Sequence, residues 1–400
     1  MKKNGSWKRW GRGDTHLINR IQWDGQEVKE MSEVLESDWF GYGPKNELFE
    51  KKLSQYTGIP YINGTNSGSS AIQVALLGLK HEGRWRPGDL VIHPVTTFAT
   101  SISSAIYLGL NPIYVETKPH TYVVDPEQVS RAVERFPEAR GMILPYILGN
   151  VPDVENISKI LGKGRFLVED CCDTLGSKFN GKHIGSFGDY AAFSFYASHH
   201  VTAGGVGGAV GTSDKRNSHL AKSLIFWGRD FRPGDEEFLK RYTYETLGTD
   251  SQMSALQAAF GIAQIEKLPE FVKARAEQFK EMTELFSQYN DLLDLPVTHS
   301  KAAPSWFSYP LTIKDNTFFD RSMFAKYLRQ NGVEGRPIMC GNITRQKPFE
   351  RVPWHSLNNG KFPIGDEIEE KSLFLPCWGM PRKQRGDYYK TIERFLKSHT

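Results

Sequence analysis

Two adjacent histidines, His199 and His200, are the residues of this chain best suited to proton transfer. Imidazole titrates close to neutral pH and is an effective general base when a fold positions it. A histidine can equally be a structural residue whose ring nitrogens are satisfied by hydrogen bonds. Residue type alone leaves both interpretations open, so the pair marks a candidate site whose other members lie elsewhere in the chain.

A run of small residues offers a binding site for a phosphate group. It spans residues 63–71, reads Asn-Gly-Thr-Asn-Ser-Gly-Ser-Ser-Ala, and precedes an apolar helical stretch. Backbone N–H groups at the start of a helix, flanked by small hydroxyl residues, form a cradle for an anion. The alternative is that these residues only cap the helix. Gly68 and Ser69 are the candidate phosphate-binding residues of this run.

Two arginines near the C-terminus suit a second anionic group. Arg336 and Arg345 lie in the segment 334–346, which reads Glu-Gly-Arg-Pro-Ile-Met-Cys-Gly-Asn-Ile-Thr-Arg-Gln. Guanidinium groups bind diphosphates through charge-assisted, bidentate hydrogen bonds. We expect these two side chains to bind a diphosphate, and the alternative is ordinary surface charge.

The elements that must position these residues alternate between strand and helix. The apolar runs at 90–94, 112–115, 141–145 and 166–170 predict buried strands, and the stretches at 69–79, 126–136 and 154–161 predict helices between them. Such alternation indicates a mainly parallel sheet that helices cover on both faces. Asp170 closes one predicted strand, and ligands of such sheets bind at the carboxyl ends of the strands.

The C-terminal part of the chain predicts a smaller unit. A long helical stretch at 255–289, interrupted at Pro269, leads into it, because proline lacks the N–H that a helix interior needs. The segments 306–314 and 332–339 indicate an α+β lobe, closed by a helix at 387–396. We therefore predict three parts: an N-terminal arm at 1–25, a large cofactor-binding domain at 26–270, and a long helix with a small C-terminal domain at 271–400.

Composition narrows the class of protein. The 400 residues are 39% hydrophobic and 24% charged, which is typical of a soluble globular protein. The net charge is only +4 and no basic cluster stands out, so we expect no nucleic-acid partner. No apolar window approaches the ~18 residues of a membrane span, and the first residues lack the apolar core of a signal peptide. Four cysteines suggest a reducing compartment, so we expect a cytoplasmic protein.

The segment around the histidines resembles a known family. Residues 192–202, Ala-Phe-Ser-Phe-Tyr-Ala-Ser-His-His-Val-Thr, are similar to the cofactor-anchoring segment of the nucleotide-sugar aminotransferases of the DegT/StrS type. Members of that family place a lysine at position 199 that binds pyridoxal 5'-phosphate covalently, and an imidazole cannot form that bond. A small branch has a His-His pair there. It contains C-3 dehydratases that resemble this chain over residues 20–398: GDP-4-keto-6-deoxymannose 3-dehydratase and CDP-6-deoxy-4-hexulose 3-dehydrase.

The resemblance implies a fold and residue roles. The fold is that of the fold type I transferases dependent on pyridoxal phosphate: α/β, with a mainly parallel mixed sheet in a large domain and a small C-terminal α+β domain. The family also implies a homodimer with active sites at the interface. His199 would be the base, and Asp170 would keep the cofactor's ring nitrogen protonated. The remaining implied contacts are Phe98 stacked on the ring, Asp173 near the ring hydroxyl, Gly68, Ser69 and Ser194 at the phosphate, and His200, Arg336, Arg345 and Trp306, with Phe307, around the substrate.

The function implied by the resemblance is removal of the 3-hydroxyl from a 4-keto-6-deoxy nucleotide sugar. Pyridoxamine 5'-phosphate would be the working form of the cofactor, and L-glutamate would restore its amine. Such an enzyme would serve dideoxysugar synthesis for lipopolysaccharide O-antigen. Two alternatives stay open: a non-enzymatic protein that binds a sugar nucleotide or cofactor, and a nucleotide-sugar aminotransferase. The second is disfavoured because histidine alone replaces the lysine.

Three departures from the family pattern matter. The CDP-type enzyme holds an iron–sulfur cluster through four cysteines, the first of which Cys172 matches, but residues 231–234 contain none of the others. Thiolates are the usual cluster ligands, so we expect no cluster, no other metal and no reductase partner. The glycine-rich loop at 203–208 lacks the family's glutamate. Asp250 stands where the family has an asparagine that contacts the cofactor phosphate, and a carboxylate there would repel phosphate unless it points away.

Overall fold

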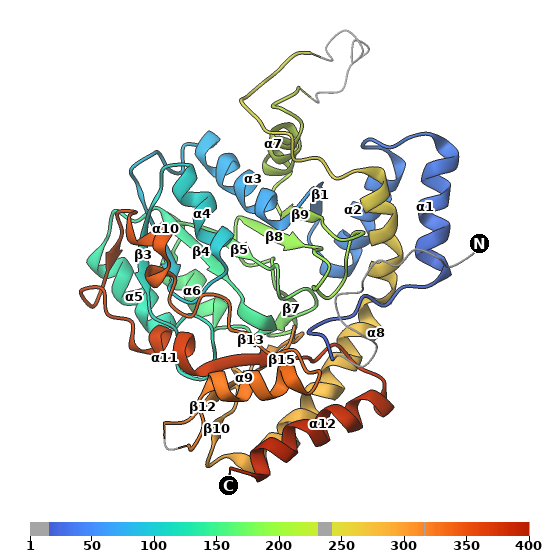
Figure 1. The fold of residues 1–400 in the computed structure, drawn as a ribbon. Helices are drawn as coiled ribbons and strands as arrows, with labels where there is room; N and C mark the ends of the chain where they lie inside the picture. The colour runs from blue at the N-terminus through green and yellow to red at the C-terminus, as the bar shows by residue number, and fades with distance from the viewer. Residues whose placement is uncertain (1–15, 231–241, 316, 400) are drawn as a thin grey trace.

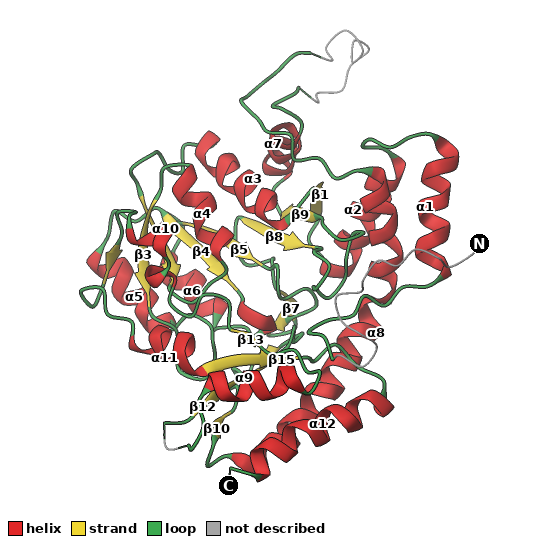
Figure 2. Cartoon of the chain, viewed as in Figure 1, coloured by secondary structure: helices red, strands yellow, loops and turns green. Residues whose placement is uncertain are grey.

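The computed structural model describes residues 16–230, 242–315 and 317–399, which form a large α/β body and a smaller lobe (Figure 1). Within these residues, an eight-stranded sheet runs through the large body (Figure 2). Its order is β1 (Tyr61–Thr65), β9 (Gly208–Thr212), β8 (Tyr190–Ser194), β5 (Phe166–Asp170), β4 (Gly141–Pro145), β2 (Leu90–Pro94), β3 (Asn111–Val115) and β14 (His355–Ser356). Only β9 runs antiparallel to its neighbours in this sheet. The expected α/β class with a mainly parallel mixed sheet is confirmed.

Helices cover both faces of this sheet because its strands are apolar on both sides. Met142 and Leu144 of β4 point into one core, and Ile143 between them points into the other. The first core is covered by α2 (Pro44–Thr57), α5 (Pro126–Arg135), α6 (Val154–Leu161) and the first half of α8 (Ala255–Phe286). The second is covered by α3 (Gly68–His81), α4 (Ala99–Tyr107) and α7 (Lys215–Ile225). The predicted strands and helices between residues 69 and 170 are thus confirmed.

The helix α8 differs from its prediction. Sequence analysis expects an interruption at Pro269, yet one helix runs from Ala255 to Phe286 through that proline. Pro269 offers no N–H to the helix, but burial on both sides of it holds the helix together. Ile262 and Leu268 lie in the core of the large body, and Met282 and Phe286 lie in the core of the smaller lobe. This helix therefore crosses the predicted domain boundary at residue 270, and the boundary itself stays a prediction.

The smaller lobe is an antiparallel sheet with helices packed against it, and it lies below the large sheet in Figure 1. Its strand order is β10 (Leu293–Asp294), β12 (Tyr309–Ile313), β15 (Ser372–Leu375) and β13 (Arg336–Pro337). The lobe also contains α9 (Arg321–Gln330), α11 (Pro363–Lys371) and α12 (Arg382–Lys397). The short elements that remain are β6 (Lys178–Phe179), β7 (Lys182–His183), β11 (Ala302–Ala303), α10 (Lys347–Glu350), η1 (Ile147–Gly149), η2 (Ser287–Tyr289) and η3 (Ile343–Arg345).

Two segments join the lobe to the body in ways that the sequence does not predict. The strand β14 belongs to the C-terminal part of the chain, yet it pairs in parallel with Ile113 and Tyr114 of β3 at the edge of the large sheet. At the other end of the chain, residues 1–15 of the predicted arm lie outside the described residues. Residues 16–22 lie against the smaller lobe, where the backbone N–H of Ile18 donates to the Glu334 carboxylate at 2.9 Å. The helix α1 (Gly25–Ser37) follows, and Asp24 caps it.

No helix among the described residues is long and apolar enough to cross a membrane.

Candidate active site

A cleft of about 550 Å³ lies at the carboxyl ends of the parallel strands. Asp170 ends β5 and Ser194 ends β8, two neighbouring strands near the middle of the sheet (Figure 1). The start of α3, after β1, and the start of α4, after β2, complete this side of the cleft. The smaller lobe closes the opposite side. Of the predicted site residues, the cleft is lined by Gly68, Ser69, Phe98, Asp170, Asp173, Ser194, His199 and Arg336, together with Phe307.

His199 sits in the loop after β8, and its hydrogen bonds fix the tautomer of its ring. Nδ1 lies 2.7 Å from the backbone oxygen of Cys172. Because a carbonyl can only accept, Nδ1 carries the proton and Nε2 keeps its lone pair. The side chain is 15% exposed, and burial lowers the pKa of His199 to about 4, against the effect of the Cys172 carbonyl and together with the positive charge of Arg275. Nε2 is therefore an unprotonated base at neutral pH.

His200 points away from the cleft. Its Nε2 donates to the backbone oxygen of Ser305 at 2.8 Å, and its Nδ1 is buried with no hydrogen-bond partner. The ring lines a small cavity behind the loop with Asn19, Arg20 and Arg275. Burial holds the pKa of His200 well below its ordinary value, and the charge of Arg275 adds to that shift. Of the two histidines, only His199 reaches the cleft.

The N-terminus of α3 forms a tight cradle against the end of β8. Ser67 caps the helix by accepting from the backbone N–H of Ser70 at 3.1 Å. The N–H groups of Gly68 and Ser69, in the first turn, have no partner within the helix. A Cβ on Gly68 would lie 2.7 Å from Cβ of Ser194 and 2.8 Å from Sγ of Cys172, so only glycine fits. The cradle thus presents free N–H groups and hydroxyls to the cleft, as a phosphate requires.

An exposed aromatic ring and a buried carboxyl face the cleft from neighbouring elements. Phe98 precedes α4 and is 53% exposed, which is unusual for a phenylalanine at the rim of a core. Asp170 is only 6% exposed and accepts from the backbone N–H of Cys172 at 3.2 Å. Burial raises the pKa of Asp170, and bonds from Cys172 and Ser101 oppose that shift. A carboxyl with a raised pKa is suited to sharing a proton with a ring nitrogen.

Asp173 lies beside the candidate base. Its Oδ1 is 3.9 Å from Nε2 of His199, which is too long for a hydrogen bond. Burial raises the pKa of Asp173 to about 7, and the nearby Asp170 charge adds to the shift. The charge of this carboxyl therefore changes within the pH range where enzymes work.

Besides His200, two further predicted site residues do not reach the cleft. Arg345 is bound by Asp366 through Nε at 2.7 Å and Nη2 at 2.6 Å, so its fork is already occupied. Trp306 is 5% exposed, and its ring stacks on Phe279 with centroids 4.2 Å apart. Both were expected near the substrate, and local packing holds both elsewhere. Arg336 does line the cleft, but its guanidinium also pairs with Glu334 at 2.6 Å.

The structure describes two of the three segments in which the sequence departs from the family pattern. Asp250 does not line the cleft, and its Oδ1 accepts from Nε2 of Gln252 at 3.1 Å. The carboxylate is thus turned to a neighbour and need not face a bound phosphate. In the glycine-rich loop, Gly205 has φ of +118°, a conformation that disfavours any other residue. The iron–sulfur prediction turns on residues 231–234, which lie outside the described residues.

Sequence reasoning missed several residues that shape the site. Glu169, next to Asp170, is fully buried and accepts from the Tyr146 hydroxyl at 2.7 Å and from the backbone N–H of Gly185 at 2.8 Å. It braces the carboxyl end of β5, and its place in an otherwise apolar strand was a signal. Tyr196 and Met339 also line the cleft, and although both lie in segments predicted to contribute to the site, neither residue was singled out.

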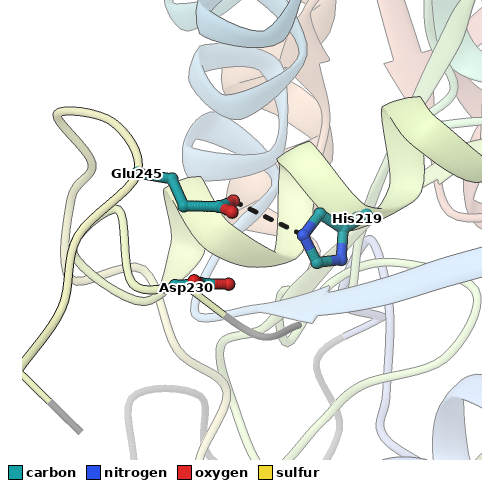
Figure 3. Close-up of side chains that lie close together, drawn as sticks. All are labelled: His219, Asp230 and Glu245. Carbon is teal, nitrogen blue, oxygen red and sulfur yellow. Dashed lines mark ion pairs between the residues drawn. The ribbon is translucent and has the colours of Figure 1, made fainter. Parts of the chain in front are cut away.

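A second cluster of polar side chains lies away from the cleft. His219 of α7 lies near Asp230 and Glu245, and its Nε2 is 3.5 Å from the Glu245 carboxylate (Figure 3). The ligand atoms of the three lie within 4.8 Å of one another, close enough for a metal ion. The ion pair already accounts for the approach of two of them, and the cluster shares no residue with the cleft.

The cleft residues fit pyridoxal or pyridoxamine phosphate. The α3 cradle could hold the phosphate, since a Cβ on Gly68 would fill it. The exposed ring of Phe98 could stack on the cofactor ring, and the carboxyl of Asp170 could contact the ring nitrogen. No lysine lines the cleft, so among the described residues none there could bind the cofactor covalently through an amine.

Comparison with known proteins places this site in context. A model of the DegT/DnrJ/EryC1/StrS aminotransferase family matches residues 22–386. The chain is 35% identical over 381 residues to dTDP-4-dehydro-2,6-dideoxy-D-glucose 3-dehydratase of Saccharopolyspora spinosa, covering 88% of this chain and 80% of that protein. It is 33% identical over 386 residues to lipopolysaccharide biosynthesis protein RfbH of Salmonella typhimurium, covering 91% and 87%. The structure of E. coli GDP-4-keto-6-deoxy-D-mannose-3-dehydratase with bound hydrated PLP matches with a TM-score of 0.88 at 24% identity, covering 95% of this chain and 100% of that one, which confirms the expected fold.

Proposed function

The chain belongs to the DegT/DnrJ/EryC1/StrS aminotransferase family, and we propose that it is a pyridoxamine phosphate-dependent C-3 dehydratase of a 4-keto-6-deoxy nucleotide sugar. One observation carries the proposal. The cleft holds a neutral histidine, His199, and no lysine. A transaminase of this family needs the lysine both to anchor the cofactor and to move protons. A dehydratase needs only a base.

The similar proteins support the same activity. The Saccharopolyspora relative and the E. coli structural neighbour are both named 3-dehydratases of nucleotide-linked deoxysugars. The Salmonella relative is named for lipopolysaccharide biosynthesis, which uses such sugars. These names span two nucleotides, so the nucleotide of this chain's substrate is left to experiment.

The residues of the cleft have different roles in the proposed reaction. When bound, pyridoxamine phosphate supplies the amine that condenses with the sugar ketone and a ring that accepts electrons as the 3-hydroxyl leaves. The Asp170 carboxyl holds a proton at the ring nitrogen, and burial strengthens that contact. His199 accepts a proton at Nε2, because the carbonyl of Cys172 keeps the proton of the ring on Nδ1. The apolar rings of Phe307 and Phe374 line the same cleft and exclude water from the reacting atoms.

The smaller lobe supplies the substrate side of the cleft. Among the described residues that line the cleft, Arg336 of β13 is the one cation, since His199 is neutral, and we assign Arg336 to the diphosphate. Binding would require its guanidinium to exchange Glu334 for the ligand, or to bind both. L-glutamate is proposed as the amine donor that restores the cofactor after each turnover. We also propose a homodimer, in line with the resemblance to the family.

The test is a single-turnover reaction with the purified protein, pyridoxamine phosphate and a panel of GDP-, CDP- and dTDP-linked 4-keto-6-deoxy sugars. Mass spectrometry should show a product of one nucleotide that has lost the 3-hydroxyl, without added iron or a reductase. A product carrying an amino group at C4 instead would identify an aminotransferase. Cofactor binding without any change of sugar mass would identify a binding protein.

The matched variants are His199→Asn and His200→Asn. Asparagine keeps much of the shape and hydrogen bonding of histidine, so His199→Asn should still bind cofactor and sugar. Loss of a positioned base should slow the elimination by about a hundred- to ten-thousand-fold. His200 does not line the cleft, so His200→Asn should retain most of the rate. Near-normal turnover in His199→Asn would show that the base lies elsewhere.

A further inference from the structure

Arg275 of α8 is a buried cation without an acidic partner among the described residues. It is 2% exposed, and its Nη1 donates to the backbone oxygen of Phe307 at 2.7 Å. Its Nη2 donates to the side-chain oxygen of Asn19 at 3.1 Å, and its Nε is buried without a partner. Burial lowers its pKa only to about 10, so the charge persists at neutral pH. Burial of a charge without a counter-ion costs folding free energy, so we looked for a function that this arginine serves.

Nη1 of Arg275 also donates to the backbone oxygen of Trp306 at 3.4 Å, and the other two partners, Asn19 and Phe307, contact His199. The side-chain amide of Asn19 donates to the backbone oxygen of His199 at 2.9 Å. The ring of Phe307 meets the His199 ring edge-on, with centroids 5.5 Å apart and planes at 72°. Asn19 thus holds the backbone of the histidine, and Phe307 holds one side of its ring. The guanidinium is the common anchor of the two.

The charge of Arg275 also acts on the histidine electrostatically. It lowers the pKa of both His199 and His200, in addition to the larger effect of burial. The other charged or titratable groups near this anchor are Arg20, which lines the cavity behind the loop, Asp173 beside Nε2, and the Cys377 thiol, which donates to the backbone oxygen of Arg275. Burial raises the pKa of Cys377 to about 12, so the thiol is neutral and does not offset the guanidinium. The guanidinium therefore disfavours an imidazolium at His199, and the Asp173 carboxyl opposes this effect to the extent that it is ionised.

We propose that Arg275 is a positioning residue for His199: it fixes Asn19 and Phe307 against the histidine and supplies the uncompensated positive charge that leaves Nε2 free to accept a proton. This role rests on the proposed function for its catalytic meaning. Arg275 acts in two ways, through the placement of Asn19 and Phe307 and through its charge, and both effects can be measured in the absence of substrate. They are also separable, because lysine retains the charge and glutamine removes it.

The test compares Arg275→Gln and Arg275→Lys with Arg385→Gln. Arg385 is a matched control, because it is also buried, at 8% exposed, and bonds the Met380 carbonyl and Glu281, neither of which lines the cleft or the cavity behind the loop. The ionisation of His199 is followed by NMR of the ¹⁵N-histidine-labelled protein, with His199→Asn to assign the signal. Arg275→Gln should raise the proton affinity of His199 by about tenfold, which is one pKa unit. In Arg275→Lys and Arg385→Gln, the proton affinity of His199 should stay within about twofold of its value in the unaltered protein.

Geometry is read from hydrogen exchange of the loop 196–202. Lysine cannot reproduce the fork to Phe307 and Asn19, so Arg275→Lys should exchange about tenfold faster there, as should Asn19→Ala. Arg385→Gln should not. A folded Arg275→Gln protein with an unchanged His199 titration would overturn the electrostatic part. If Arg275→Gln does not fold, unchanged exchange in both Arg275→Lys and Asn19→Ala would overturn the proposal. Neither readout requires turnover, so failure of the proposed dehydration would not be mistaken for failure here.

Discussion

At position 199, a backbone carbonyl decides which ring nitrogen reacts. The oxygen of Cys172 holds the proton of His199 on Nδ1, 2.7 Å away. A lysine at this position would compete with the substrate for the cofactor, whereas a neutral imidazole only exchanges protons. Histidine in place of lysine thus prevents covalent attachment of the cofactor at this position and keeps a group that can accept a proton. Two predictions belong to this residue.

The first concerns pH. Burial lowers the pKa of His199 to about 4, so the base stays unprotonated well below its ordinary value of 6.5. The fall in rate that protonation of His199 causes should therefore lie near pH 4 and not near 6.5, whereas Asp173 titrates separately and closer to neutral pH. Measurement of kcat/KM across overlapping buffers checks this, since that ratio reports the free enzyme.

The variant Asp173→Asn separates the titration of Asp173 from that of His199 in the pH–rate profile. The pKa of Asp173 is raised to about 7 by burial and by Asp170, so the wild-type profile should carry an inflection near pH 7. Asp173→Asn should lose that inflection and keep the acid limb. An acid limb near 6.5 in both proteins would contradict the assigned state of His199.

The second prediction concerns the bond to the cofactor. The cleft is lined by no lysine, so borohydride treatment with pyridoxal phosphate should leave no covalent adduct on the segment 192–202. In His199→Lys the same treatment should attach the cofactor to position 199, and dehydration should fall. Peptide mass mapping measures both. An adduct on a lysine of the unaltered protein would refute the assignment.

At the scale of elements, the contact between α3 and β8 builds the phosphate cradle. A Cβ at Gly68 would meet Ser194 at 2.7 Å and Cys172 at 2.8 Å, so Gly68→Ala must push the helix start from the strand end. Overpacking of this kind costs about 1–3 kcal/mol of the free energy of unfolding. The affinity for pyridoxamine phosphate should fall with it. Urea titration and cofactor fluorescence measure the two effects.

The control is Gly386→Ala. Gly386 lies within α12, and no atom lies within 4 Å of the Cβ that alanine would add. Alanine in a helix interior should be neutral or stabilising by about 0.5–1 kcal/mol. Equal behaviour of the two variants would mean that the cradle is not tight.

The sequence predicts the elements whose pattern is local. The strand β5 begins with the apolar run 166–168 because helices cover both its faces, and its acidic end marks Asp170 for the site. It does not predict β14, because two residues carry no periodicity, nor the passage of α8 through Pro269, because packing in two cores overrides the proline. The role of Arg275 is hidden for a similar reason. One arginine in an amphipathic helix is ordinary until its partners, distant in sequence, are known.

At the scale of the whole molecule, an exposed apolar surface lies beside the cleft. Phe40 is 48% exposed, and its backbone oxygen binds the start of α8 at the Ala255 N–H. Val206 is 50% exposed, and its backbone oxygen accepts from Gln257 of the same helix turn. Tyr196 is 53% exposed, and it lines the cleft together with Val206. Exposed apolar side chains beside a site favour an interface.

We therefore expect light scattering to give twice the mass of the chain. Phe40→Glu should weaken the dimer and lower the rate, because a charge would be buried at the interface. Phe318→Glu, on an aromatic that is 86% exposed in the smaller lobe, should change neither. A fully active monomer would refute the assembly.

The pairing of β14 with β3 has a consequence for synthesis on the ribosome. The edge of the large sheet at β3 is completed by residues 355–356, which leave the ribosome last among the strands of that sheet. Until then β3 presents unpaired N–H and carbonyl groups, the kind of edge on which nascent chains aggregate. A chain truncated after residue 340 should thus aggregate more readily during refolding than the full chain. A segment that is translated late, β14, would thus protect the edge of β3, a strand in the first third of the chain.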